Sequence, residues 1–104
     1  MTQRNEQQIE VRIDSDLADL IPGYLENRRK DVSDIWVALE LEDYETIRVL
    51  GHGMKGSGGG YGFEAITELG RALEQAAKNR ELKTIKKQAV DLLYYLDHLQ
   101  LIYE

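Results

Sequence analysis

The chain has 104 residues, 42% of them hydrophobic, which suits one compact domain with a single core. Its 19 acidic and 13 basic side chains give a net charge of −6, which argues against a nucleic-acid backbone as the partner. The absence of cysteine excludes a disulfide framework and thiol chemistry. The N-terminus is polar and no apolar run is long enough to cross a membrane, so we expect a soluble, cytoplasmic protein.

The first thirteen residues predict a flexible N-terminal arm. Apolar and charged residues alternate from Ile9 to Ile13, as in a strand, but nothing else in the chain predicts a second strand that could pair with this one. Asp14 or Asp16 can cap a short helical segment over residues 14–21. We therefore divide the chain into an arm, residues 1–13, and a helical domain, residues 14–104.

Four apolar stripes with helical spacing follow this segment. They run from Ile21 to about Leu41, from Asp43 to the glycine cluster, from about Phe63 to Asn79, and from Leu82 through Leu99 to Tyr103. The connections are short, so consecutive helices should be antiparallel neighbours. The sequence therefore predicts an all-α fold, an up-down-up-down four-helix bundle with a short N-terminal helical segment.

The second predicted helix contains a histidine among glycines. His52 projects about 150° away from the apolar face of this helix, whereas Gly51 lies on that face and should set a close helix–helix distance. The outward stripe of His52 also carries Arg48, Lys55, Gly56 and, if the helix extends that far, Gly59. Each glycine in a helix costs about 1 kcal/mol relative to alanine, and such a cost is typical of functional or tightly packed sites. We predict that Gly56 and Gly59 clear a docking surface, with Arg48 beside it.

The spacing of several residues around His52 resembles a known family motif. Histidine phosphotransfer (HPt) domains have a histidine, then lysine, glycine and a small or hydroxyl residue three, four and five positions later, glycine ten positions later, and Glu or Gln twenty-two positions later. The chain has His52, Lys55, Gly56, Ser57, Gly62 and Glu74 at these positions. The resemblance covers about residues 17–104 and implies a four-helix bundle with an exposed phosphoacceptor histidine on its second helix. The glycine run at 58–60 is richer than the family pattern.

The chemistry of such a site follows from the residue types. A neutral imidazole can attack a phosphoryl group through one ring nitrogen while the other keeps its proton and is oriented by a carboxylate. We expect Nε2 of His52 to be phosphorylated and Nδ1–H to point at Glu74, which lies near the edge of the apolar face of the third helix. Lys55 supplies a cation for the phosphoryl charge, with Arg48 as a second candidate. No cluster of carboxylates near His52 predicts a metal site, so we expect no cofactor, and Mg²⁺ only in the partner.

Three hypotheses follow for the function. The leading one is a phosphorelay intermediate, in which His52 carries a phosphoryl group between receiver-domain aspartates without any kinase activity of its own; the family resemblance implies receiver domains of response regulators or hybrid kinases as partners. The second is a phosphoacceptor domain excised from a larger hybrid or chemotaxis-type histidine kinase, which Glu74 in place of glutamine favours slightly. The third is a helical interaction module without phosphotransfer. Residues 55–60 have the wrong order for a nucleotide-binding P-loop, and a monomer is the expected state.

Overall fold

The computed structural model describes residues 8–104, which form four helices, two short strands and two 3-10 turns. In chain order these are β1 (Ile9–Ile13), η1 (Ser15–Leu17), α1 (Ile21–Glu40), α2 (Tyr44–Ser57), η2 (Gly59–Tyr61), α3 (Glu64–Lys78), α4 (Leu82–Asp97) and β2 (Leu99–Tyr103). Residues 1–7 of the predicted arm lie outside the described part of the chain.

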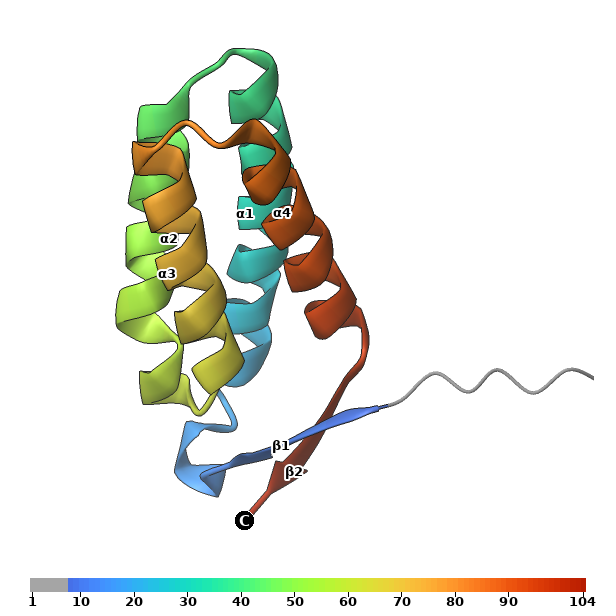
Figure 1. Cartoon of the computed structure of the whole chain (residues 1–104). Coiled ribbons are helices and arrows are strands. Elements are labelled where there is room, and N and C mark those ends of the chain that lie inside the picture. The colour runs from blue at the N-terminus through green and yellow to red at the C-terminus, as the bar shows by residue number, and fades with distance from the viewer. Residues whose placement is uncertain (1–7) are drawn as a thin grey trace, which may run out of the picture.

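The four helices lie side by side as a bundle, with the two strands beyond one end of it (Figure 1). Each helix contributes apolar side chains to one shared core, whose fully enclosed members include Ile35 of α1, Ile47 of α2, Leu73 of α3 and Leu92 of α4. The predicted all-α four-helix bundle is therefore confirmed, with a small sheet added to it. No helix within residues 8–104 is both long enough and apolar enough to cross a membrane.

Local signals in the sequence explain where the helices begin. Pro22 lies in the first turn of α1, where its missing N–H costs no hydrogen bond. The Asp43 carboxylate accepts a hydrogen bond from the Thr46 backbone N–H at 3.0 Å and so caps α2. Before α3 the chain turns at Gly62, whose φ of 97° favours glycine. The starts of α1 and α2 and the turn before α3 therefore follow ordinary helix and turn chemistry.

The strands correct two predictions. The segment from Ile9 to Ile13 is not an arm without a partner, because it pairs in parallel with β2, in a register that places Ile9 beside Leu99 and Ile13 beside Tyr103. The fourth helix correspondingly ends at Asp97 and does not continue to Tyr103. Apolar residues at 99 and 103 fit helical spacing, but those at 99, 101 and 103 also alternate as in a strand. Pairing with β1 decides between the two patterns, and Ile13 of β1 is completely buried in the core.

Two glycines bring α2 and α3 unusually close together. A Cβ atom at Gly51 would lie 2.8 Å from the Gly70 carbonyl oxygen, and a Cβ at Gly70 would lie 2.5 Å from the Lys55 backbone nitrogen. Side-chain carbon is essentially never found this near to backbone atoms, so only glycine fits at either position. The prediction that Gly51 sets a close helix–helix distance is confirmed, and its counterpart on α3 is Gly70.

Candidate functional site

His52 stands on the outer face of α2. The buried face of this helix consists of Ile47, Gly51 and Met54, and the His52 side chain is 65% exposed. The imidazole can therefore be reached from solvent without any movement of the core.

Glu74 reaches His52 from the neighbouring helix. Its Oε2 atom lies 3.0 Å from Nδ1 of His52, although the Glu74 side chain is only 9% exposed. The carboxylate is thus held at the seam between α3 and α2, beneath the imidazole. The structure has the contact between Nδ1 and Glu74 that we expected from the sequence.

Lys55 binds the same carboxylate. Its Nζ atom lies 2.7 Å from Oε1 of Glu74, so the two carboxylate oxygens have separate partners on α2. The hydrogen bond from Lys55 is the largest cause that lowers the pKa of Glu74 to about 2, and the bond with His52 contributes in the same direction. Glu74 is therefore ionised at neutral pH and can only accept hydrogen bonds.

The ionised carboxylate determines the tautomer of the neutral histidine. Because Glu74 can only accept, Nδ1 of His52 must carry the proton that joins them. The lone pair of the neutral ring is then on Nε2, the other nitrogen of this exposed side chain. The arrangement presents one nucleophilic nitrogen to solvent and fixes the ring from behind.

The close approach of α2 and α3 makes this arrangement possible. A Cβ atom at Gly51, the residue before His52, would lie 2.7 Å from the Glu74 backbone nitrogen. Any side chain there would push Glu74 outward and lengthen its reach to the imidazole. The glycine pair therefore places the carboxylate as well as the helices.

The glycines near His52 have different surroundings. Apart from the adjacent residues and the nearby backbone of α2 itself, no atom lies within 4 Å of a Cβ built at Gly53 or Gly56, so both border open space on the exposed side of α2. Gly59 differs, because α2 ends at Ser57 and a Cβ at Gly59 would lie 3.0 Å from the Glu64 carboxylate. The condition for placing Gly59 on the outward stripe of α2 is therefore not met, and a docking role stays a prediction for Gly59.

Thr67 of α3 explains why the helix stops, and the sequence analysis missed it. Its hydroxyl accepts a hydrogen bond from the Gly59 N–H at 2.8 Å and donates one to the Lys55 carbonyl at 3.2 Å. A Cβ at Gly58 would lie 2.6 Å from the Thr67 backbone nitrogen. The only available signal was its position on α3, three residues before Gly70 on the side that faces α2.

Arg48 is paired within its own helix. Its guanidinium donates to both carboxylate oxygens of Glu45, at 3.0 and 2.6 Å, and this partner is the main cause that raises the pKa of Arg48. Its side chain is half-buried, on the outward face that also carries His52. A role in docking stays a prediction for Arg48.

An aromatic cluster supports the other side of α2. The Tyr24 hydroxyl lies 2.9 Å from Ser57 Oγ, and the Tyr24 ring stacks on Tyr61 with 4.2 Å between the ring centroids. The guanidinium of Arg28 lies over the Tyr24 ring, and a hollow of about 400 Å³ between α1 and α2 reaches from this cluster to Gly53. This cluster fixes the C-terminal end of α2, and Ser57 is a hydrogen-bonding residue in it.

Residues 8–104 contain no group of three or more His, Cys, Asp or Glu side chains placed to hold a metal ion. What the arrangement offers is one exposed ring nitrogen, a buried carboxylate behind the ring, and a lysine on that carboxylate. These parts suit a nucleophile that accepts and releases an electrophilic group.

The comparison with known families gives one match. The family model described as Hpt domain matches residues 14–101, which is most of the chain. No curated protein and no solved structure matches the chain significantly. The chain therefore belongs to the Hpt-domain family, the histidine phosphotransfer modules of two-component phosphorelays.

Proposed function

We propose that His52 carries the phosphoryl group and passes it between aspartates of receiver domains. The observation that supports this most strongly is the hydrogen bond of 3.0 Å between Nδ1 of His52 and the ionised Glu74 carboxylate. It leaves Nε2 exposed and unprotonated, as an attacking nitrogen must be.

The transfer step needs no net proton. The Nε2 lone pair attacks the phosphorus of a phosphoaspartate, the N–P bond forms, and the bond from phosphorus to the aspartate oxygen breaks with its electron pair left on the aspartate. The ring then carries a positive charge and keeps its proton on Nδ1. Glu74, 3.0 Å from that nitrogen, stabilises this charge. In the return step an acceptor carboxylate attacks phosphorus, and the N–P electrons return to Nε2.

Lys55 has two tasks in this proposal. It holds Glu74 in place through the contact of 2.7 Å, and its charge lies on the same stripe of α2 as the phosphorylated nitrogen. We expect Lys55→Ala to slow transfer and to leave the bundle folded, because the side chain is partly exposed and has no place in the core. Transfer by the Lys55→Ala protein at the wild-type rate would contradict both of these roles.

The receiver domain would dock on the exposed side of α2. Gly53 and Gly56 leave this surface bare beside His52, and Val49, which is 53% exposed, adds an apolar contact. A large side chain at Gly56 should block docking while leaving the imidazole intact. The receiver's own carboxylates would bring any Mg²⁺ that the reaction uses.

The experiment uses two phosphoryl donors of different size. The wild-type protein and His52→Gln are incubated with phosphorylated receiver domains and, separately, with phosphoramidate, a donor too small to need a docking surface. We expect label on the wild type from both donors, stable in base and lost in acid, and none on His52→Gln. Label retained by His52→Gln would overturn the assignment of the phosphoacceptor.

Gly56→Tyr separates docking from chemistry. It should accept the phosphoryl group from phosphoramidate as the wild type does and lose transfer from receivers. Equal loss with both donors would show that the substitution damages the site itself, and unchanged transfer from receivers would place docking elsewhere.

A further inference from the structure

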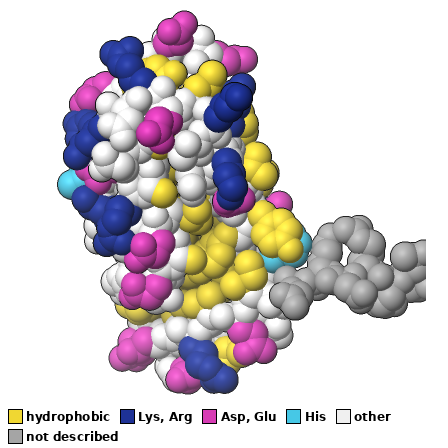
Figure 2. All heavy atoms as spheres, in the orientation of Figure 1, with side chains coloured by type: hydrophobic (Ala, Val, Ile, Leu, Met, Phe, Trp, Pro, Cys, Tyr) yellow, Lys and Arg dark blue, Asp and Glu magenta, His cyan; other side chains and the backbone are white. Residues whose placement is uncertain are grey.

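A second surface lies on the far side of α3 from Glu74. Two hollows of about 520 and 470 Å³ meet there and share Ile9, Ala65 and Tyr95 in their walls. Ala65 and Glu74 are nine residues apart on α3, so their side chains point about 180° apart around this helix. Figure 2 shows exposed hydrophobic side chains as a yellow stripe down the middle of this face.

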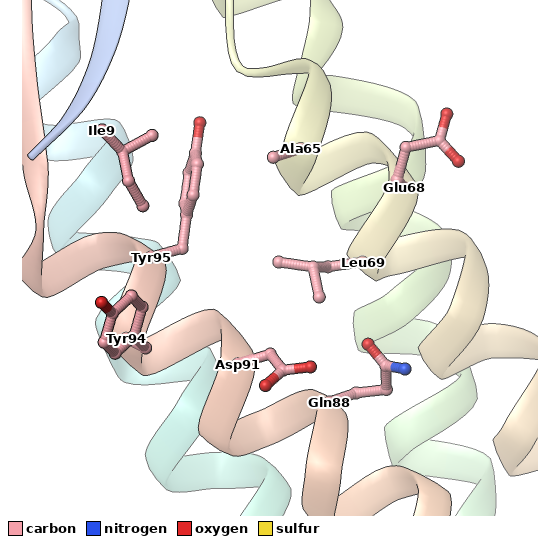
Figure 3. A pocket seen from close by; sticks show the side chains of 8 residues that line it. All are labelled: Ile9, Ala65, Glu68, Leu69, Gln88, Asp91, Tyr94 and Tyr95. Atoms are coloured by element: carbon pink, nitrogen blue, oxygen red, sulfur yellow. The ribbon is translucent and has the colours of Figure 1, made fainter. Parts of the chain in front are cut away.

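The larger hollow has an apolar floor. Figure 3 shows Ala65 and Leu69 of α3 facing Tyr95 of α4 across the gap, with the Tyr95 ring directed between Ile9 and Ala65. Ala65 and Leu69 are each only partly buried, so the hollow exposes apolar surface to solvent. An apolar side chain of a partner would fit a space of this size and lining.

Tyr95 places an unused polar group in this apolar surface. The residue is 8% exposed, and no residue within 8–104 forms a hydrogen bond with its hydroxyl. The oxygen is not sealed in the core, because the described residues contain no enclosed side-chain polar atom without a partner. Burial raises the pKa of Tyr95 to about 12, so the hydroxyl keeps its proton and can donate as well as accept. A mostly buried hydroxyl without a partner among the described residues indicates a place for an external polar group.

Strand β1 adds backbone groups to the second hollow. The Ile9 N–H donates to the His98 carbonyl, and the Ile13 carbonyl accepts from the Glu104 N–H, so the odd-numbered residues of β1 form the ladder with β2. Glu10 and Arg12 alternate with them and therefore direct their N–H and C=O groups to the other edge. Both residues line the second hollow together with Tyr95. The same surface thus offers strand-edge hydrogen bonds beside an apolar hollow.

The charge around the two hollows is mainly negative. Glu10, Glu64, Glu68 and Asp91 line them, and Arg12 is the only cationic residue among the described ones that does. Glu68 and Asp91 each have a basic partner on their own helix, whereas Glu10 and Glu64 form no ion pair with any described residue. A partner with basic side chains would complement this charge, and an acidic one would be repelled.

We propose that this surface binds an extended peptide segment of a protein partner, which adds to the free edge of β1 through Glu10. The segment places an apolar side chain against Ala65 and Leu69, makes a backbone hydrogen bond with the Tyr95 hydroxyl, and carries Lys or Arg on either side of the apolar residue. Because this surface and His52 lie on opposite sides of α3, both can be occupied at once. The inference does not depend on the function proposed for His52.

The test uses a capped heptapeptide with leucine at its centre, threonine and valine beside it, and lysine at both ends. Titration into ¹⁵N-labelled protein should move the backbone amide signals of Glu10 and Arg12 and give a dissociation constant. Tyr95→Phe removes only the hydroxyl and should weaken binding about threefold to tenfold, the effect of one neutral hydrogen bond. Tyr94→Phe is the matched control, because Tyr94 also lines the larger hollow but its ring stacks on His98 and points away from Ala65 and Leu69 (Figure 3).

Peptide variants complete the experiment. Replacement of the central leucine by serine, or of both lysines by glutamate, should weaken binding at least tenfold. The proposal is overturned if the amides of Glu10 and Arg12 do not move at millimolar peptide, if Tyr95→Phe and Tyr94→Phe bind equally well, or if the glutamate peptide binds as tightly as the lysine peptide. Self-association of the protein that Tyr95→Phe weakens would also overturn it, since the occupant would then be a second copy of the chain.

Discussion

Helix α3 packs against its two neighbours in opposite ways. Toward α2 it presents Gly70, and the backbones approach so closely that neither this residue nor Gly51 can carry a side chain. Toward α4 it presents Ala65 and Leu69, and an open hollow of about 520 Å³ remains between the helices. One helix therefore has a tightly packed side and a loosely packed side.

The two sides also differ in how they treat a buried polar group. On the tight side the Glu74 carboxylate is within 3.0 Å of both His52 and Lys55, and both of its oxygens are used. On the loose side the Tyr95 hydroxyl forms no hydrogen bond with any described residue. A buried charge must be satisfied within the fold, and that requires a short, fixed distance between helices. A neutral hydroxyl at the edge of a hollow can form its hydrogen bond with water or with a partner.

The largest effect is expected when a side chain is placed in the close contact between α3 and α2. Gly70→Ala would place a Cβ atom 2.5 Å from the Lys55 backbone nitrogen, so α2 and α3 must separate. We expect this variant to lose about 3 kcal/mol of unfolding free energy, the upper range for overpacking a well-packed core. Urea denaturation measures it.

Gly53→Ala is the matched control for Gly70→Ala. A Cβ there would contact no atom beyond its own stretch of α2, so the substitution should stabilise the protein by up to about 1 kcal/mol through helix propensity alone. If the two alanine variants have the same free energy of unfolding, the close contact between α2 and α3 does not contribute to stability.

The next effect concerns catalysis on the tight side. Glu74→Gln keeps the size of the side chain and removes its charge, so the ring loses the partner that stabilises its cationic phosphorylated form. We expect phosphotransfer about tenfold slower, which is the lower range for a hydrogen bond to a charged group. Glu68→Gln is the control, because Glu68 lies on the same helix, is exposed, and pairs with Arg71 away from His52. Equal transfer rates in the two variants would contradict the role proposed for Glu74.

The contrast between the two sides of α3 also shows what sequence can predict. Helical spacing predicts the four helices, apart from the end of the fourth, because it depends on residues a fixed number of turns apart. The contact between His52 and Glu74 joins two helices, and its prediction depends on the offset of the glutamate in the family motif and on its place near the edge of the apolar face of α3. The pairing of β1 with β2 was missed because it joins the two ends of the chain, and each strand alone has no partner in its sequence neighbourhood. The role of Thr67 and the free hydroxyl of Tyr95 were missed because they depend on packing distances between helices.

The pH dependence of stability should report directly on the ionised Glu74 carboxylate, on the tightly packed side of α3. The pKa of Glu74 is lowered in the folded protein from 4.5 to about 2, chiefly by Lys55. A lowered pKa means that the carboxylate stabilises the fold fully above its ordinary pKa, and that this contribution is lost as pH falls from about 4.5 toward 2. The stability difference between wild type and Glu74→Gln should therefore shrink over that range.

Denaturation midpoints of both proteins between pH 6 and pH 2 measure this difference. Asp43 and Glu45 also have lowered pKa values, but they are present in both proteins and cancel in the comparison. A difference that stays constant with pH would show that Glu74 is not held as an ion by Lys55 and His52.

The smallest effect is expected on the loose side. Leu69→Ala enlarges a hollow that is already open, so water fills the new space and no closed cavity forms. We expect a loss of about 1 kcal/mol, the value for apolar surface that is only half removed from water. This is less than for Gly70→Ala, one residue along the same helix, although Leu69→Ala removes three carbon atoms and Gly70→Ala adds only one. Phosphotransfer should be unchanged, because Leu69 lines the hollow toward α4 and points about 140° away from Glu74 around α3. Denaturation and transfer assays on this variant test whether the two sides of α3 are independent. A transfer defect would mean that the hollow between α3 and α4 and the histidine site are coupled through the helix.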